Sequence, residues 1–156
     1  MPKKKIVKPK KLSLDKLWQL AIISRDRRCV RCGSPNGLAG HHIVSRKHKM
    51  LRYFKGNGIT LCFPCHMFFV HRDTARGAEM IKSKIGNKKY QELIRVPDLF
   101  LNKYYTKDII LKVEQYLNGH LQFNLYEFLN LVASNKQKGN IRPDGENQQT
   151  DKDIQK

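Results

Sequence analysis

The sequence predicts a small α+β fold in which two short strands and a helix are stapled by a zinc ion, with further helices before and after them. Two observations lead to this fold class. Two C-x-x-C pairs, Cys29/Cys32 and Cys62/Cys65, stand 29 residues apart and contain all four cysteines of the chain. Short β-type segments lie between the pairs, and apolar residues at helical spacing lie outside them. The 156 residues suffice for one domain of ordinary size.

The cysteine spacing favours a metal site over disulfides. The N-terminus lacks the apolar segment of a secretory signal, and no run of 18 apolar residues could cross a membrane. We therefore expect a reducing compartment, namely the cytoplasm of a bacterial or phage-infected cell, or the nucleus of a eukaryote. Four thiolates close a tetrahedral zinc site, so the zinc is expected to be structural. The alternatives are four buried free thiols, or a redox pair in a βαβ context that the sequence lacks.

The charge of the chain predicts a polyanionic partner. Net charge is +18, from 31 basic and 13 acidic residues. The first 11 residues hold six lysines and no acid, and residues 134–156 hold five bases and four acids, so residues 12–133 carry the remaining +11. Nucleic acid is the commonest partner of a domain with this much positive charge. The alternative interpretation is a basic surface that is only solvated and binds no partner.

The N-terminal half is expected to form a helix, a hairpin and a second helix. Ser13 can cap a helix that begins at Leu14 and ends near Arg25 or Asp26, with Trp18 in the core. A strand is expected at 38–44, a basic loop at 45–56 and a second strand at 59–61. Pro64 suits the first turn of the helix that follows.

Helices are also expected in the C-terminal half. A helical segment at 74–96 is predicted to break at Gly77 and Gly86, and two further helices are expected at 106–117 and 125–132. The buried side of the first segment is expected to comprise Met80, Ile81, Ile85, Tyr90, Leu93 and Ile94. The predicted organisation is a disordered basic arm (1–11), a core domain (12–96), a helical extension packed on it (97–133) and a disordered tail (134–156).

The segment between the cysteine pairs carries a recognisable motif. It contains His41-His42-Ile43, and then Asn57 in the sequence N-G-I-T-L-C-F-P-C-H, which ends at His66. In this order the motif resembles the HNH endonucleases, and in particular the zinc-stapled members common in phages and mobile elements. The resemblance covers about residues 14–93 and implies a fold of two strands followed by a helix, with a divalent metal held at the active site.

The resemblance also implies roles for single residues. His42 is similar to the general base of the family, and His41 and His66 match its catalytic metal ligands. Asn57 matches the central asparagine, which braces the loop and orients the base. His71 is a possible third ligand, but it follows His66 by five residues, whereas a ligand one helical turn away would follow by four. A phosphate contact is the alternative for His71.

This chemistry agrees with the residue types. A neutral imidazole can take a proton from water, and a divalent ion such as Mg²⁺ or Mn²⁺ can stabilise the leaving oxygen. Neighbouring residues of a strand point to opposite faces, so the two adjacent histidines can take different roles. DNA is the expected substrate, contacted mostly through phosphates by Arg46, Lys47, Lys49 and Arg52. A non-catalytic zinc module that binds nucleic acid, and an RNase, are the alternatives. No membrane contact is expected.

Overall fold

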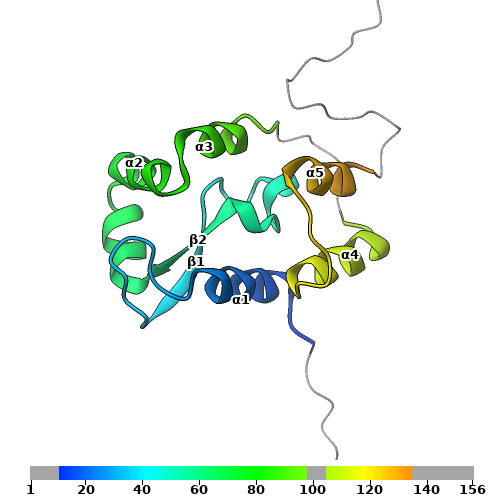
Figure 1. Cartoon of the computed structure of the whole chain (residues 1–156), viewed down its shortest axis with the longest axis horizontal. Helices are drawn as coiled ribbons and strands as arrows, with labels where there is room; N and C mark the ends of the chain where they lie inside the picture. The colour runs from blue at the N-terminus through cyan, green and yellow to red at the C-terminus, as the bar shows by residue number, and fades with distance from the viewer. Residues whose placement is uncertain (1–10, 98–104, 135–156) are drawn as a thin grey trace, which may run out of the picture.

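The computed structural model describes residues 11–97 and 105–134. The expected basic arm lies outside these residues except for Lys11, and the expected tail lies outside them except for Ser134. Within the described residues the structure mixes five α-helices with a two-stranded antiparallel sheet, which confirms the small α+β class (Figure 1). None of the described helices combines the length and the apolar character that a membrane span requires.

The first helix supports the hairpin. Helix α1 covers Leu14–Asp26, and Ser13 caps it by accepting a hydrogen bond from the backbone of Lys16, as the sequence predicted. Strands β1 (Leu38–His42) and β2 (Gly58–Cys62) pair from Leu38 opposite Cys62 to His42 opposite Gly58. Helix α1 packs across both strands, and Trp18 and Ile22 are its buried residues. The hairpin therefore has one face closed by α1.

The helices after the hairpin cover its other side. The π-helix η3 (Cys65–Val70) follows β2 and packs against α2 (Thr74–Ile85), which is followed by α3 (Asn87–Ile94). Gly86 separates α2 from α3 with φ +88°, as expected, whereas the break predicted at Gly77 was wrong. Gly77 lies inside α2 because its missing side chain lets the helix approach Val70, whose Cα would lie 3.1 Å from an added Cβ.

Of the residues expected on the buried side of this region, Ile81 and Leu93 are buried. Ile94 was predicted to be buried but is 46 % exposed, because it follows Leu93 on a short helix that turns only one face to the core.

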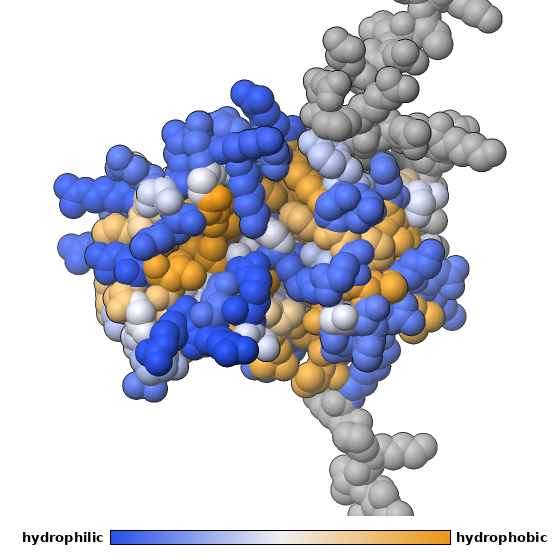
Figure 2. All heavy atoms as spheres, viewed as in Figure 1, coloured by the Kyte–Doolittle hydropathy of each residue, from blue (hydrophilic) through white to orange (hydrophobic). Residues whose placement is uncertain are grey.

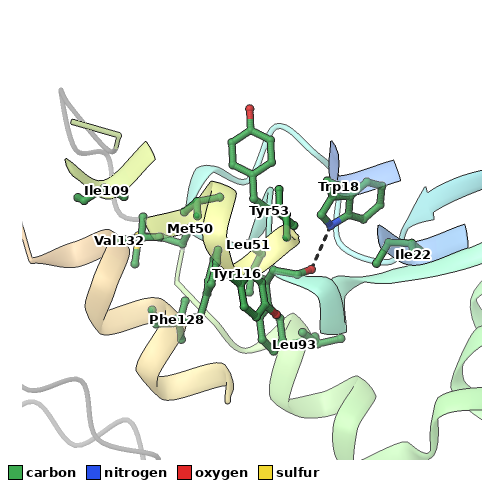
Figure 3. Packing of buried hydrophobic residues seen from close by; sticks show 14 residues of the cluster. Trp18, Ile22, Met50, Leu51, Tyr53, Leu93, Ile109, Tyr116, Phe128 and Val132 are labelled. Carbon is green, nitrogen blue, oxygen red and sulfur yellow. Dashed lines mark hydrogen bonds between the residues drawn. The ribbon is translucent and has the colours of Figure 1, made fainter. Parts of the chain in front are cut away.

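The last two helices build the main core together with the loop of the hairpin. Helix α4 covers Lys107–Leu117 and α5 covers Leu125–Ala133, close to the expected bounds. Two short 3-10 turns, η1 (Lys49–Leu51) and η2 (Lys55–Asn57), shape the loop between the strands. Figure 3 shows Met50 and Leu51 of η1 beside Phe128 of α5 and Tyr116 of α4. The loop that carries the predicted phosphate contacts is thus anchored by residues far along the chain.

Hydrophilic side chains dominate the surface seen in Figure 2, and apolar surface shows between them across the middle of the same face. The exposed apolar residues include three around the start of η3, namely Phe63, Met67 and Phe68.

Candidate metal centres and active site

The four cysteines converge at one end of the hairpin. Cys29 and Cys32 lie in the turn after α1, where Gly33 has a positive φ of +78°, while Cys62 ends β2 and Cys65 begins η3. The four sulfurs lie within 4.8 Å of one another, and those of Cys32 and Cys62 are 3.6 Å apart. Two sulfurs bound to one zinc ion at about 2.3 Å lie about 3.8 Å apart. The cluster is therefore compatible with the predicted structural zinc.

The surroundings of the cysteines favour a bound cation. Burial raises the pKa of the Cys29 thiol, but backbone hydrogen bonds from Cys32, Cys62 and Arg31 outweigh it and lower this pKa to about 6. Burial raises the pKa of Cys65, which reaches about 12 beside the other thiols even though Arg31 lowers it. A cation between the four sulfurs, such as the predicted zinc, would favour their ionised form. Arg31 donates to the Cys65 sulfur at 3.4 Å and lies over the Phe69 ring.

Three histidines converge on the other side of the hairpin, where β1 meets η3. His41 Nδ1 lies 3.0 Å from His66 Nε2, which lies 3.2 Å from His71 Nε2. Two nitrogens bound to one metal at about 2.1 Å lie about 3.0 Å apart at a right angle and about 3.4 Å apart at the tetrahedral angle. The spacing of the three rings thus fits a shared metal ion. Burial, followed by the charges of neighbouring histidines, lowers the pKa of His41 to about 4, which favours the neutral form that binds metals.

The π-helical turn accounts for the position of His71. Its backbone N–H donates to the carbonyl of His66 at 3.1 Å, five residues back, which is the hydrogen bond of a π-turn. In an α-helix a spacing of five would turn the two side chains apart, but a π-turn brings them onto one face. From the sequence, the five-residue gap left two interpretations of His71 open, a metal ligand or a phosphate contact. In the π-turn this gap is compatible with the metal cluster.

His42 faces the opposite side of β1 from His41. Its ring stacks on the indole of Trp18 with centroids 3.7 Å apart and an angle of 8° between the planes. His42 Nε2 lies 2.9 Å from the carbonyl oxygen of Arg52. Since a carbonyl only accepts, Nε2 carries the proton and Nδ1 keeps its lone pair. Burial lowers the pKa of His42, which favours the neutral ring.

Asn57 is fully buried and ties the two ends of the inter-strand loop together. Its Oδ1 accepts from the backbone N–H of Val44 at 2.7 Å, and its Nδ2 donates to the carbonyls of Val44 and Leu51 at 2.9 and 3.2 Å. These partners are backbone atoms on both sides of the loop, so the geometry suits a residue that braces the loop.

A cavity of about 570 Å³ opens beside the histidine cluster. His41, His42, His66 and His71 line it together with Arg46. Its wall also contains residues of the later helices, namely Thr74, Ala78, Ile81 and Tyr90. The cavity therefore borders both the three-histidine cluster and His42.

The four basic residues expected to bind phosphates do not share one environment. Arg46, Lys47 and Lys49 are exposed, and Arg46 borders the cavity. Arg52 is engaged with the protein itself, because its guanidinium donates to both carboxylate oxygens of Asp15 at 3.0 and 2.7 Å. This contact lowers the pKa of Asp15 and raises that of Arg52.

Sequence reasoning missed three contacts of these sites. It treated Trp18 only as a core residue and gave no part to Asp15 or Arg31. These residues contact His42, Arg52 and Cys65 across sequence separations of 24 to 37 residues. No local pattern marks such contacts, so the sequence contained no signal that could have revealed them.

Comparison with known proteins supports the motif. A family model described as HNH endonuclease matches residues 29–67, a segment that contains both cysteine pairs, His41, His42, Asn57 and His66. This match confirms the resemblance inferred from the motif. Comparisons with curated proteins and with solved structures found no match.

Proposed function

Because residues 29–67 match the HNH endonuclease family, we propose that the chain is a metal-dependent endonuclease that hydrolyses phosphodiester bonds of DNA. The observation that carries this proposal is that the two adjacent histidines of β1 have different surroundings. His41 turns toward His66 and His71, while the adjacent His42 turns to the other face and makes none of the contacts of that cluster. A protein that only binds nucleic acid needs neither arrangement.

In this proposal His41, His66 and His71 hold a divalent metal ion. Three imidazole nitrogens that approach one another at 3.0 and 3.2 Å fit such a site. A bound divalent ion supplies Lewis-acid stabilisation of the leaving oxygen. Burial lowers the pKa of His66 as well as that of His41, so both rings stay neutral and available as ligands at neutral pH.

His42 acts as the general base. The hydrogen bond from Nε2 to the Arg52 carbonyl leaves the lone pair on Nδ1, where it can accept a proton from water. The ring is neutral at neutral pH because burial lowers its pKa. Asn57 supports the base indirectly, because its hydrogen bonds fix the start of the loop at Val44, two residues beyond His42.

DNA is bound mostly through its phosphates. The net charge of +18 supplies a strong sequence-independent attraction. Arg46 borders the cavity beside the histidines, and Lys47 and Lys49 are exposed on the same loop. Arg52 is a weaker candidate for a phosphate contact, since its guanidinium is already paired with Asp15. Affinity for duplex DNA should therefore fall steeply with salt, and a Lys47→Ala variant should lose affinity for unrelated sequences equally.

The test is single-turnover cleavage of plasmid DNA by the zinc-loaded protein with added Mg²⁺ or Mn²⁺. Wild type should cut, and EDTA should abolish cutting. His42→Ala should lose about 10²–10⁴ in rate while keeping its zinc, its fold and its DNA affinity. His66→Ala should instead lose affinity for the added metal, so a higher metal concentration should restore part of its rate.

Two outcomes would contradict the proposal. Undiminished cutting by His42→Ala would exclude His42 as the general base. Absence of cutting by wild type with any divalent metal, together with salt-sensitive DNA binding, would favour a zinc module that only binds nucleic acid. Parallel assays on a matched RNA duplex test the RNase alternative, which would predict faster cleavage of RNA than of DNA.

A further inference from the structure

We propose that Trp18 of α1 is a positioning residue that fixes the ring of His42 for catalysis, and that α1 is therefore part of the active site as well as of the core. This inference rests on the proposed function, in which His42 is the base. Trp18 lies 11 residues before the segment that matches the HNH endonuclease family, so the family match does not include it.

The first support is the geometry of the ring contact. The indole and the imidazole are parallel within 8° with centroids 3.7 Å apart, which is a full face-to-face contact between two flat rings. Such a contact restricts tilting of the imidazole about its long axis. A base must hold its lone pair within a few tenths of an ångström of the productive position, and misplacement by about 1 Å can cost a hundredfold in rate.

The indole itself is rigidly held. Trp18 is 2 % exposed, and its Nε1–H donates to the carbonyl oxygen of Phe54 at 3.2 Å (Figure 3). Two strand glycines make room for it, since a Cβ on Gly40 would lie 3.0 Å from the indole and a Cβ on Gly58 would lie 2.6 Å from it. The ring on which His42 stacks is thus fixed by a hydrogen bond at one edge and by the backbone of both strands.

The same helix also fixes the second contact of His42. The Arg52 carbonyl accepts the Nε2–H of His42, and the Arg52 guanidinium donates two hydrogen bonds to the carboxylate of Asp15, three residues before Trp18 on α1. Residues three apart lie on neighbouring positions of one helix face. Helix α1 therefore restrains the imidazole at its face through Trp18 and at its edge through Arg52.

A tryptophan that served only the core would predict a different pattern of effects. Its replacement would lower stability, but the molecules that remain folded would cleave normally. The two roles separate in the variant Trp18→Leu, which keeps an apolar side chain but loses the flat face, and in Trp18→Phe, which keeps a flat face. Ile22→Ala is the matched control, because Ile22 is fully buried on the same helix and also borders Gly58.

The experiment measures single-turnover DNA cleavage, DNA affinity and melting temperature for these variants, with each rate taken well below the melting temperature of that variant. Trp18→Leu should lose about 10- to 100-fold in rate with unchanged DNA affinity, and Trp18→Phe should recover most of that loss. Ile22→Ala should lose comparable stability but stay within about threefold of the wild-type rate. Equal rates for folded Trp18→Leu and for wild type would overturn the inference.

Two spectroscopic readouts do not require cleavage by the protein. Trp18 is the one tryptophan of the chain, so its emission and near-ultraviolet circular dichroism report on the stack. His42→Ala should change these spectra, whereas His41→Ala, on the opposite face, should leave them near wild type. Added imidazole should restore part of the cleavage by His42→Ala, and should restore much less in the double variant with Trp18→Leu.

The outcomes separate this inference from the proposed function. Normal cutting by His42→Ala would refute the role of His42 as general base. Loss of cutting by His42→Ala combined with normal cutting by Trp18→Leu, with equal imidazole rescue in both backgrounds, would refute only the positioning role. Spectra of Trp18 that are indifferent to His42→Ala would refute the stack on which the inference depends.

Discussion

Replacing Asn57 by alanine should destabilise the protein more than the loss of one side chain of its size would suggest. The side chain makes three hydrogen bonds with the backbone of Val44 and Leu51. The Leu51 carbonyl keeps a second partner in the N–H of Phe54, but the N–H and the carbonyl of Val44 would each lose the Asn57 contact. A buried polar group left unpaired costs about 1–3 kcal/mol. Both Val44 contacts are part-buried, so about 1.5 kcal/mol for each predicts a loss of about 3 kcal/mol, on the order of 10 °C in melting temperature.

The assay is urea unfolding of the zinc-loaded protein, with Thr60→Val as the matched control. Thr60 is equally buried, and its hydroxyl donates to the carbonyl of Ile22 at 3.1 Å, so its replacement leaves that one carbonyl without this donor and should cost about 1 kcal/mol. Asn57→Asp should be at least as damaging as the alanine variant, because a carboxylate oxygen would replace the amide that donates to two carbonyls. A cost for Asn57→Ala no greater than that of Thr60→Val would refute this reasoning.

Three further predictions address the metal sites and an ion pair. Cys62→Ser should lose the bound zinc and the fold together, and elemental analysis finding one zinc per folded variant would contradict this. His71→Ala should weaken binding of Mn²⁺ by about tenfold or more in titration calorimetry, whereas unchanged affinity would exclude it as a ligand. Burial raises the pKa of Asp26, but its contacts with Arg25 and Thr60 outweigh this and lower it below 3.8. The paired carboxylate therefore stabilises the fold above that pH, so Asp26→Asn should lower the free energy of unfolding near neutral pH. The difference in unfolding free energy between variant and wild type should narrow as the pH falls below 3.8. A difference that does not change with pH would contradict this.

Much of the fold could be predicted because its signals are local. Ser13 caps α1 through its own side chain, and Gly86 ends α2 because φ +88° suits glycine. The prediction failed at Gly77, where glycine serves the close approach of α2 to Val70 and not a break. Local sequence cannot distinguish these two uses of glycine, since the distinction depends on a neighbour that arrives from another element.

The histidine cluster marks a second limit of sequence reasoning. The pair His41-His42 and the alternation of a strand sufficed to predict that the two rings would turn to opposite faces. The spacing of His66 and His71 was harder to interpret, because a gap of five fits one face of a π-turn but not of an α-helix. Backbone hydrogen bonding in η3, and not residue type, decides which of the two applies.

The hairpin connects the two proposed metal centres, because each centre takes ligands from its strands. Cys62 pairs with Leu38 at one end of the sheet, and His41 pairs with Ile59 three positions along it, a distance of about 10 Å at the rise of a strand. His66 directly follows Cys65, so η3 belongs to both centres. A two-stranded hairpin is at best marginally stable alone, so its register depends on what holds its ends. Zinc at the cysteines would therefore hold the strands in the register that brings His41 to His66, although it takes no part in the chemistry.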